Sequence, residues 1–218
     1  MTMTSLAPVK RRTKRYGLLP KISAKRALDL VLTVMILLAI WPVLLSVAGL
    51  VALTSRGPVF FVQTRVGRYG APFRMLKFRS MYRDAEARRA QLVQQSERDG
   101  VCFKMRKDPR VTPVGRFIRR WSLDELPQLI NVLKGDMSLV GPRPALPQEV
   151  AAYPAKAHGR HSVLPGITGL WQVSGRADVG FDEMIALDLA YARQVSVLTD
   201  IQIMFRTFQA VWGGRGAY

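Results

Sequence analysis

Cysteine is almost absent from this chain of 218 residues: Cys102 is the only one. An internal disulfide is therefore excluded, and the fold must be held together by burial, which suits a reducing compartment. The sequence also lacks a Walker loop and a G-x-G-x-x-G pattern, so neither a P-loop nor a Rossmann nucleotide site is indicated. The length suits one compact domain with an appendage and is too short for two full-sized domains.

Acidic residues are also scarce: 15 Asp and Glu face 33 Lys and Arg, which gives a formal net charge of +18. So basic a chain attracts anions, and the candidates are nucleic acid, anionic lipid headgroups and phosphorylated small molecules. A hydrophobic fraction of 49% is high for a free nucleic-acid binder, because such proteins expose more polar surface. Composition therefore favours lipid or phosphorylated substrates over nucleic acid.

The first 26 residues contain eight Lys and Arg and no acidic residue, and they predict a disordered basic arm. Anionic lipid attracts such an arm by roughly 1 kcal/mol per basic residue near the surface. A solvated tail with no partner is the alternative interpretation.

An uncharged run from Leu30 to Leu53 follows the arm and predicts a membrane segment over residues 27–56. If it were straight, it would extend about 36 Å and could cross a bilayer core of about 30 Å. Pro42 lies near its middle, and proline there removes one backbone hydrogen bond and kinks the helix. Both flanks are basic, so the positive-inside rule favours a re-entrant helix-kink-helix over the alternative, a kinked spanning helix.

Residues 57–218 are expected to form one catalytic domain of α/β class, mostly α. Val59 to Val66 and Pro72 to Phe78 are β-rich runs around a Gly-Arg-Tyr-Gly turn, which predicts a hairpin. Apolar spacing predicts helices over 82–97, 113–120, 124–133, 182–194 and 199–212, with irregular Gly and Pro loops between them. The last has Asp200 placed to cap its start, and its apolar stripe fits either the core or an amphipathic interfacial helix.

Two adjacent acids, Asp124 and Glu125, stand at the predicted start of a helix, after a run of arginines. The helix could be capped by Ser122 in a capping box with Glu125, or by Asp124, which suits Pro127 better. Either arrangement puts carboxylates at a positive helix end, where the ionised form is favoured and could attack phosphorus. From spacing alone, a structural cap is the ordinary interpretation.

The surrounding motifs resemble those of the bacterial sugar transferase family, the monotopic polyprenyl-phosphate phosphoglycosyl transferases that initiate capsule, exopolysaccharide or O-antigen units. The similarity runs in the family's order from about Lys25 to the C-terminus. It rests on these strings: KRALD (25–29), GPVFFVQ (57–63), KFRSM (77–81), SLDELPQ (122–128), NVLKGDMS (131–138), GPRP (141–144), PGITG (165–169) and QVSGR (172–176).

The resemblance implies that Asp124 is the nucleophile that attacks the β-phosphorus of a UDP-sugar, holds the sugar phosphate and releases UMP. Glu125 would assist, either with Asp124 as a ligand of Mg²⁺ or by deprotonating the acceptor, undecaprenyl phosphate. Phosphoryl transfer requires cations around the acids. The bases expected to bind substrate phosphate are Lys77, Arg79, Arg143 and Arg176, and Asp188 resembles a further acidic position of the family.

The same resemblance implies a domain on the cytoplasmic side of the bacterial inner membrane, with membrane lipid as a partner, no nucleic acid, and a possible homodimer. Glycines at 166, 169 and 175 are expected to permit close approach of the backbone to a ligand. Two other functions are kept as alternatives: a non-catalytic membrane scaffold of a polysaccharide assembly complex, and a membrane-tethered nucleic-acid binder. The sugar is left open.

Overall fold

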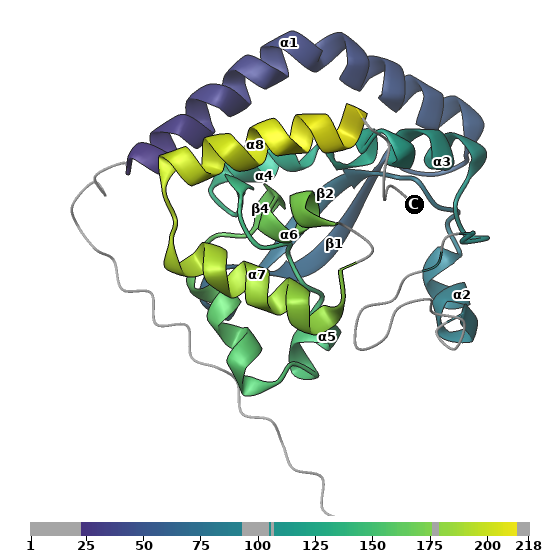
Figure 1. The fold of residues 1–218 in the computed structure, drawn as a ribbon. Helices are drawn as coiled ribbons and strands as arrows, with labels where there is room; N and C mark the ends of the chain where they lie inside the picture. Colours follow the sequence, from purple (N-terminus) through teal and green to yellow (C-terminus); the bar gives the residue numbers. More distant parts are fainter. Residues whose placement is uncertain (1–22, 93–104, 106, 176–178, 213–218) are drawn as a thin grey trace, which may run out of the picture.

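The computed structural model describes residues 23–92, 105, 107–175 and 179–212, and there the chain is mostly helical with two small sheets (Figure 1). The predicted mostly-α class is thus confirmed. The helices are α1 (Ala24–Thr54), α2 (Ala85–Leu92), α3 (Pro113–Arg120), α4 (Gln128–Lys134), α5 (Pro147–Ala151), α6 (Leu170–Ser174), α7 (Phe181–Arg193) and α8 (Val197–Trp212). The strands are β1 (Phe60–Val66), β2 (Pro72–Phe78), β3 (Ser138–Val140) and β4 (Gly166–Thr168). The 3-10 helices among the described residues are η1 (Arg68–Gly70), η3 (Leu123–Glu125) and η4 (Ala155–Ser162).

The predicted hairpin is confirmed, since β1 and β2 pair antiparallel from Phe60 opposite Phe78 to Val66 opposite Pro72. Its turn puts Tyr69 in the left-handed region, with φ of 56°. The second sheet was not predicted: β3 and β4 pair in parallel where the sequence suggested irregular loops. Three-residue strands show no measurable period, and the partner strand is distant in sequence, so local patterning could not reveal them.

Most predicted helices are present, with shifted ends. Helix α3 has the predicted bounds, and α7 begins and ends within one residue of them. Of the helix expected over 82–97, the structure describes α2, and residues 93–97 lie outside the described residues. Asp200 does not cap α8: the helix starts at Val197, and the Ser196 hydroxyl accepts a hydrogen bond from the Thr199 amide at 3.1 Å.

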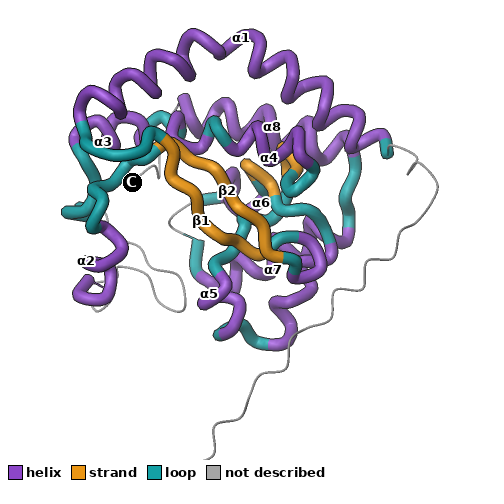
Figure 2. The backbone as a smooth tube through the Cα atoms, turned by 180° about the vertical axis from the view of Figure 1, so that it is seen from behind, coloured by secondary structure: helices purple, strands orange, loops and turns teal. Residues whose placement is uncertain are grey.

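Helix α1 is continuous over 31 residues, contains Pro42, and bends near its middle so that both ends reach the same domain (Figures 1 and 2). By length and composition, α1 could cross a membrane. The helix begins at Ala24, so Lys25 and Arg26 belong to α1, whereas the rest of the predicted basic arm, residues 1–22, lies outside the described residues.

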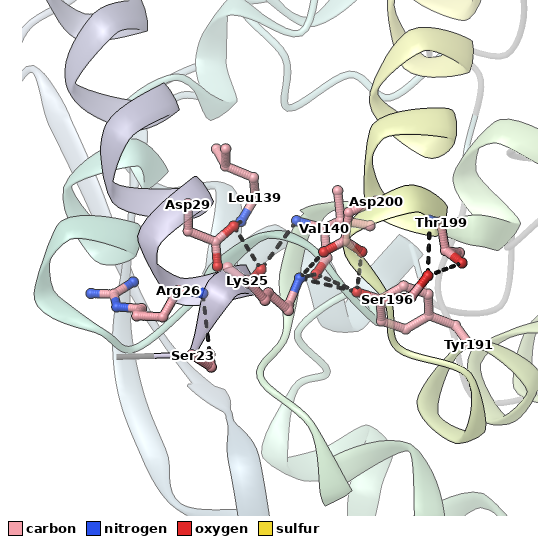
Figure 3. A network of polar contacts seen from close by, with 11 residues as sticks. Ser23, Lys25, Arg26, Asp29, Leu139, Val140, Tyr191, Ser196, Thr199 and Asp200 are labelled. Carbon is pink, nitrogen blue, oxygen red and sulfur yellow. Dashed lines mark hydrogen bonds and ion pairs between the residues drawn. The ribbon is translucent and has the colours of Figure 1, made fainter. Parts of the chain in front are cut away.

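The N-terminal end of α1 is held by a polar network (Figure 3). The Lys25 ammonium contacts the Asp200 carboxylate at 2.5 Å, the Tyr191 hydroxyl at 3.2 Å and the Val140 carbonyl at 3.1 Å. One turn later, buried Asp29 accepts hydrogen bonds from the hydroxyl of Ser138 and the amide of Leu139, both at 3.1 Å. Burial of the Tyr191 hydroxyl and its bond to Asp200 raise the pKa of this phenol, so it stays protonated.

The C-terminal end of α1 is attached to the same domain at a different place. Val47 and Val51 are buried in a cluster with Phe78 of β2 and Ile118 of α3. Just past the helix, Ser55 accepts two hydrogen bonds from the Arg79 guanidinium through its carbonyl and hydroxyl oxygens, at 2.6 and 2.7 Å. The two ends of α1 therefore lie on one side of the bend, against one domain.

Large apolar side chains remain exposed on the layer formed by α1, α8 and α3. Helix α8 runs beside α1 in both views (Figures 1 and 2) and buries Ile203 while exposing other apolar residues. Large exposed apolar surfaces are typical of membrane or protein contacts. The exposed residues include Val31, Met35, Leu38, Trp41, Leu45 and Leu53 of α1, Phe117 of α3, and Leu198, Ile201, Phe205 and Phe208 of α8.

Replacing Asp29 with alanine is expected to destabilise the protein, because the buried Leu139 amide would lose its acceptor. An unsatisfied buried donor costs about 1–3 kcal/mol, and each kcal/mol lowers the melting temperature of a chain this size by about 2–4 °C. The measurement is thermal unfolding in detergent. Asp182→Ala, which removes an exposed carboxylate, is the control; an unchanged melting temperature for Asp29→Ala would contradict the tether.

Candidate active site

Asp124 and Glu125 lie in η3, a tight turn between α3 and α4. Neither predicted cap is present: α4 begins at Gln128 with Pro127 as its N-cap residue, and neither Ser122 nor Pro127 provides a capping side chain. The reason is local: Ser122 adopts the left-handed conformation, with φ of 55°, and this turn in the chain comes before η3, ahead of the start of α4. The two acids therefore stand ahead of the helix with their carboxylates available for other partners.

Packing of α3 on the hairpin positions this turn. The Thr112 hydroxyl caps α3 by accepting a hydrogen bond from the Gly115 amide at 2.8 Å. Gly115 lies so close to the Ser80 carbonyl that a β-carbon there would stand 1.9 Å from its oxygen, so only glycine fits. Helix α3 thus packs directly on the chain that follows β2, which places η3 beside Lys77.

Lys77, from β2, contacts the acid pair directly: its ammonium lies 2.6 Å from Glu125 Oε1. The Asp124 carboxylate is buried, with an exposed fraction of 7%, whereas Glu125 and Lys77 are half-buried. Two further cations act on the pair electrostatically, Arg119 from α3 and Arg143 from the loop after β3. The structure thus brings Asp124, Glu125, Lys77 and Arg143 together in one place, and their roles stay predictions.

The two neighbouring carboxylates ionise differently. The pKa of Asp124 is raised to about 6, chiefly by burial and also by the negative charge of Glu125, while the positive charge of Lys77 opposes the increase. Burial also opposes ionisation of Glu125, but Lys77 and Arg143 outweigh it and hold the pKa of Glu125 well below its usual range. Glu125 is therefore charged throughout the neutral range, while Asp124 gains its charge only above about pH 6.

The acid pair lines a cavity of about 1050 Å³ whose wall carries both polar and apolar side chains. The polar lining includes both acids with Lys77, Arg119 and Arg143. The apolar wall is built from residues of several elements: Ile36 of α1, Leu129 of α4, and Met204, Phe208 and Val211 of α8. Such a cavity can hold a ligand that carries both charged and apolar groups.

Arg143 lies between two buried prolines, Pro142 and Pro144, and its own side chain is exposed. No hydrogen bond or ion pair to its guanidinium is found within the described parts of the chain. A planar guanidinium in this position can take phosphate oxygens in a bidentate manner.

Sequence reasoning gave no role to two residues that line the same cavity. Arg119 was noted only as one of the bases before the acids. The Gln172 amide nitrogen donates to the Ile167 carbonyl at 3.1 Å, and its buried Oε1 has no hydrogen-bond partner among residues that the structure describes. A run of arginines and a lone glutamine give no local signal of this placement; only the tertiary fold supplies it.

The remaining predicted residues lie elsewhere or outside the described residues. Arg79 lines the cavity, but its guanidinium donates to the Ser55 and Pro58 carbonyls, and burial lowers its pKa. Phosphate binding by Arg79 stays a prediction. Asp188 is buried in α7 and does not line the cavity, whereas its ion-pair partner Arg160, 2.5 Å away, does. Arg176 lies outside the described residues.

The glycines near β4 were expected to lie close to a ligand, but in the structure they lie against the backbone of Gly141. A β-carbon on Gly166 would lie 2.0 Å from the Gly141 amide nitrogen, and one on Gly169 would lie 2.3 Å from the Gly141 carbonyl oxygen. The close approach is therefore between two segments of backbone: β3 with the loop that follows it, and β4 with the loop that follows it. This contact is what brings the Arg143 loop against the cavity.

Asp124 and Glu125 have the carboxylate chemistry that a magnesium site requires. Within the described residues, no group of three or more His, Cys, Asp or Glu could hold a metal ion. Magnesium usually binds through one or two carboxylates together with substrate phosphates and water, so Asp124 and Glu125 supply enough protein ligands for that mode.

Comparison with known proteins agrees with this geometry. A family model described as "Bacterial sugar transferase" matches residues 20–214. The exopolysaccharide production protein ExoY of Sinorhizobium fredii is 39% identical over 199 residues, which are 89% of this chain and 88% of that protein.

Two longer proteins match through part of their length. The galactosyl transferase CpsE of Streptococcus agalactiae is 49% identical over 162 residues, 74% of this chain and 36% of that protein. The undecaprenyl-phosphate galactose phosphotransferase of Salmonella typhimurium is 43% identical over 201 residues, 89% of this chain and 41% of that protein. The chain thus spans well under half the length of these two relatives. Both the family model and the ExoY match cover most of this chain, and the chain belongs to the bacterial sugar transferase family.

Proposed function

We propose that this protein transfers a sugar 1-phosphate from a UDP-sugar to undecaprenyl phosphate, releases UMP, and so begins the assembly of an exopolysaccharide, capsule or O-antigen. The observation that supports this most directly is the buried Asp124 next to Glu125, with Lys77, Arg119 and Arg143, in the lining of a cavity that also has apolar walls. Relatives named as undecaprenyl-phosphate galactose and glucose phosphotransferases support the choice of substrates.

In the first step, an ionised Asp124 oxygen attacks the β-phosphorus of the UDP-sugar. A new bond forms between this oxygen and phosphorus, and the bond from the same phosphorus to the oxygen bridging to the α-phosphate breaks. UMP leaves with that electron pair, and the sugar phosphate stays on Asp124. Lys77, Arg119 and Arg143 are placed to stabilise the negative charge on the phosphate oxygens, which is the main requirement of phosphoryl transfer.

In the second step, a phosphate oxygen of undecaprenyl phosphate attacks the same phosphorus. The bond from phosphorus to Asp124 breaks, the carboxylate is restored, and the product is undecaprenyl diphosphate sugar. Glu125 is ionised and can accept a proton from the acceptor phosphate. A Mg²⁺ ion bound by Asp124 and Glu125 would supply positive charge to the phosphates.

A re-entrant α1 on the cytoplasmic side of the inner membrane fits this chemistry. Lys25 at one end of α1 bonds Asp200, and Ser55 just beyond the other end bonds Arg79 of the same domain. A helix whose two ends both contact one globular domain has both ends on one side of the bilayer. The exposed apolar residues of α1 and α8 support immersion of that face in lipid, near the apolar tail of the acceptor.

Labelling of introduced cysteines tests this topology. With Cys102 replaced by serine, Ser23→Cys and Arg56→Cys place a thiol at each end of α1, on exposed residues. An impermeant maleimide is expected to label both sites in inverted membrane vesicles and neither in intact spheroplasts. Labelling of the two sites from opposite sides would establish a spanning helix and contradict the re-entrant arrangement.

The proposed activity is tested with purified protein, undecaprenyl phosphate, Mg²⁺ and a panel of UDP-sugars, following released UMP. At least one UDP-glucose, UDP-galactose or N-acetylated UDP-sugar is expected to support UMP release with a lipid-linked sugar as product. A folded, membrane-bound protein that releases UMP from none of them would favour the scaffold. Tight, salt-dependent DNA binding in a filter assay would favour the nucleic-acid binder.

The first step is expected to depend on pH through Asp124, which attacks only when ionised. Because burial raises the pKa of Asp124 to about 6, the rate of UMP release should be at its plateau above pH 7. It should fall about tenfold per unit as the pH drops below 6. Single-turnover assays from pH 4.5 to 8.5 measure this; a flat profile down to pH 4.5 would rule out this ionisation as the controlling one.

A further inference from the structure

Three successive carbonyl groups of the Pro142–Pro144 loop each accept a hydrogen bond from a different part of the fold. The Pro142 carbonyl accepts from the Gly166 amide at 2.9 Å. The Arg143 carbonyl accepts from Arg160 Nη2 at 2.9 Å, and the Pro144 carbonyl accepts from Arg65 Nη1 at 3.0 Å. The backbone on both sides of the Arg143 side chain is therefore fixed, while that side chain itself stays exposed.

The central hydrogen bond comes from a buried ion pair. Arg160 and Asp188 have exposed fractions of 2% and 1%, and their charged groups lie 2.5 Å apart. A second nitrogen of Arg160 donates to the Tyr153 hydroxyl at 2.8 Å. Without Asp188, the buried guanidinium would lose its counter-ion, which is a strongly unfavourable state. Asp188 therefore holds the Arg160 guanidinium in place, and that guanidinium in turn fixes the Arg143 backbone.

The flanking hydrogen bonds belong to separate elements. Arg65 of β1 is buried, and Gln63 Oε1 accepts from its Nε at 3.0 Å and from its Nη2 at 2.6 Å, which leaves Nη1 for the Pro144 carbonyl. Gly166 starts β4 and lies against Gly141, so its amide reaches the Pro142 carbonyl without a side chain between them. The loop is thus held from β1, β4, η4 and α7 at once.

We infer that Asp188 and Arg160 are positioning residues for Arg143: they fix its main chain so that its guanidinium meets the phosphates of the sugar nucleotide. This assignment rests on the proposed function. It gives Asp188 an indirect role, through Arg160 and the main chain of Arg143, and not a role at the reacting atoms. Positioning is valuable in phosphoryl transfer, because a displacement of about 1 Å can cost about a hundredfold in rate.

A double-mutant cycle between Asp188 and Arg143 tests the inference. Asp188→Asn is expected to lower kcat/KM for the UDP-sugar about a hundredfold, and Arg143→Ala about a hundredfold to a thousandfold. Because Asp188 acts through Arg143, adding Asp188→Asn to Arg143→Ala should cost less than about threefold more. A full further hundredfold loss in the Arg143→Ala background would show an independent effect on the fold and overturn the inference.

Two additional variants separate positioning from folding. Tyr153→Phe removes one partner of Arg160 while keeping the ring, and a loss of about fivefold that disappears in the Arg143→Ala background is expected. Asp182→Asn on the same helix breaks an exposed ion pair with Lys156 and should leave kcat/KM unchanged. Melting temperatures in detergent identify any variant that fails to fold. If Asp188→Asn fails to fold, the result for Tyr153→Phe decides whether Arg160 positions Arg143.

The outcomes also separate this inference from the proposed function. If the unaltered protein releases no UMP from any UDP-sugar, the proposed function fails. If the unaltered protein is active and Asp188→Asn, although folded, keeps full kcat/KM, the inference fails and the proposed function stands.

Discussion

Asp124→Asn is expected to lower UMP release by about 10⁴-fold or more, because the amide cannot form the acyl phosphate on which both proposed steps depend. Asparagine has nearly the shape of aspartate, so it can occupy the same buried place in η3. The measurement is steady-state UMP release from a UDP-sugar in the presence of undecaprenyl phosphate, together with the amount of protein found in the membrane fraction.

The matched control for this variant is Asp182→Asn, which makes the same change at an exposed aspartate of α7. It should keep full activity. Asp124→Asn should remain in the membrane at the normal level, since α1 and the exposed apolar face are unchanged. Normal turnover by Asp124→Asn would remove this side chain from the reaction and with it the covalent route.

Lys77→Met is the second large effect: UMP release at pH 7 should fall about a hundredfold to a thousandfold. The lysine offsets the burial of both acids, and its removal leaves Glu125 without its ion-pair partner at 2.6 Å. Because Lys77 lowers the pKa of Asp124, the pH at which UMP release is half-maximal should also move upward from about 6 in this variant. Single-turnover rates measured across pH report both changes.

Arg74→Met provides the comparison for Lys77→Met, since it removes one positive charge from an exposed position on the same strand. Its rate and pH profile should match those of the unaltered protein. If the pH of half-maximal UMP release is unchanged in Lys77→Met, or shifts equally in Arg74→Met, direct contact with Lys77 does not control the ionisation of Asp124.

Local sequence signals predicted those parts of the fold that are determined locally. The hairpin β1–β2 follows from β-rich runs around a turn, and helix α3 follows from apolar spacing. These signals lie within a few residues of the structure they produce. The start of α4 was predicted four residues too early, because nothing in the sequence marks Ser122 as left-handed. The pairing of β3 with β4 depends on contact between Gly141 and Gly166, which is decided only by tertiary packing.

The active site divides in the same way. Asp124, Glu125, Lys77 and Arg143 lie in contiguous family motifs, and all four line the cavity of the structure. Arg119 was passed over because it stands in a run of arginines that looks uniform in the sequence. The buried Asp188–Arg160 pair joins α7 to η4, and its link to the Arg143 carbonyl is visible only in three dimensions.

The central claim is that the sugar phosphate is held on Asp124 between the two substrates, and trapping it is the most direct test. The unaltered protein is mixed with its UDP-sugar and no acceptor, and UMP and intact protein mass are measured together. We expect a burst of about one UMP per protein, a mass increase of one sugar phosphate located on Asp124 by peptide analysis, and loss of both when undecaprenyl phosphate is added. UMP released only after the acceptor is added, with no adduct at any time, would contradict this account and indicate direct transfer between the two substrates.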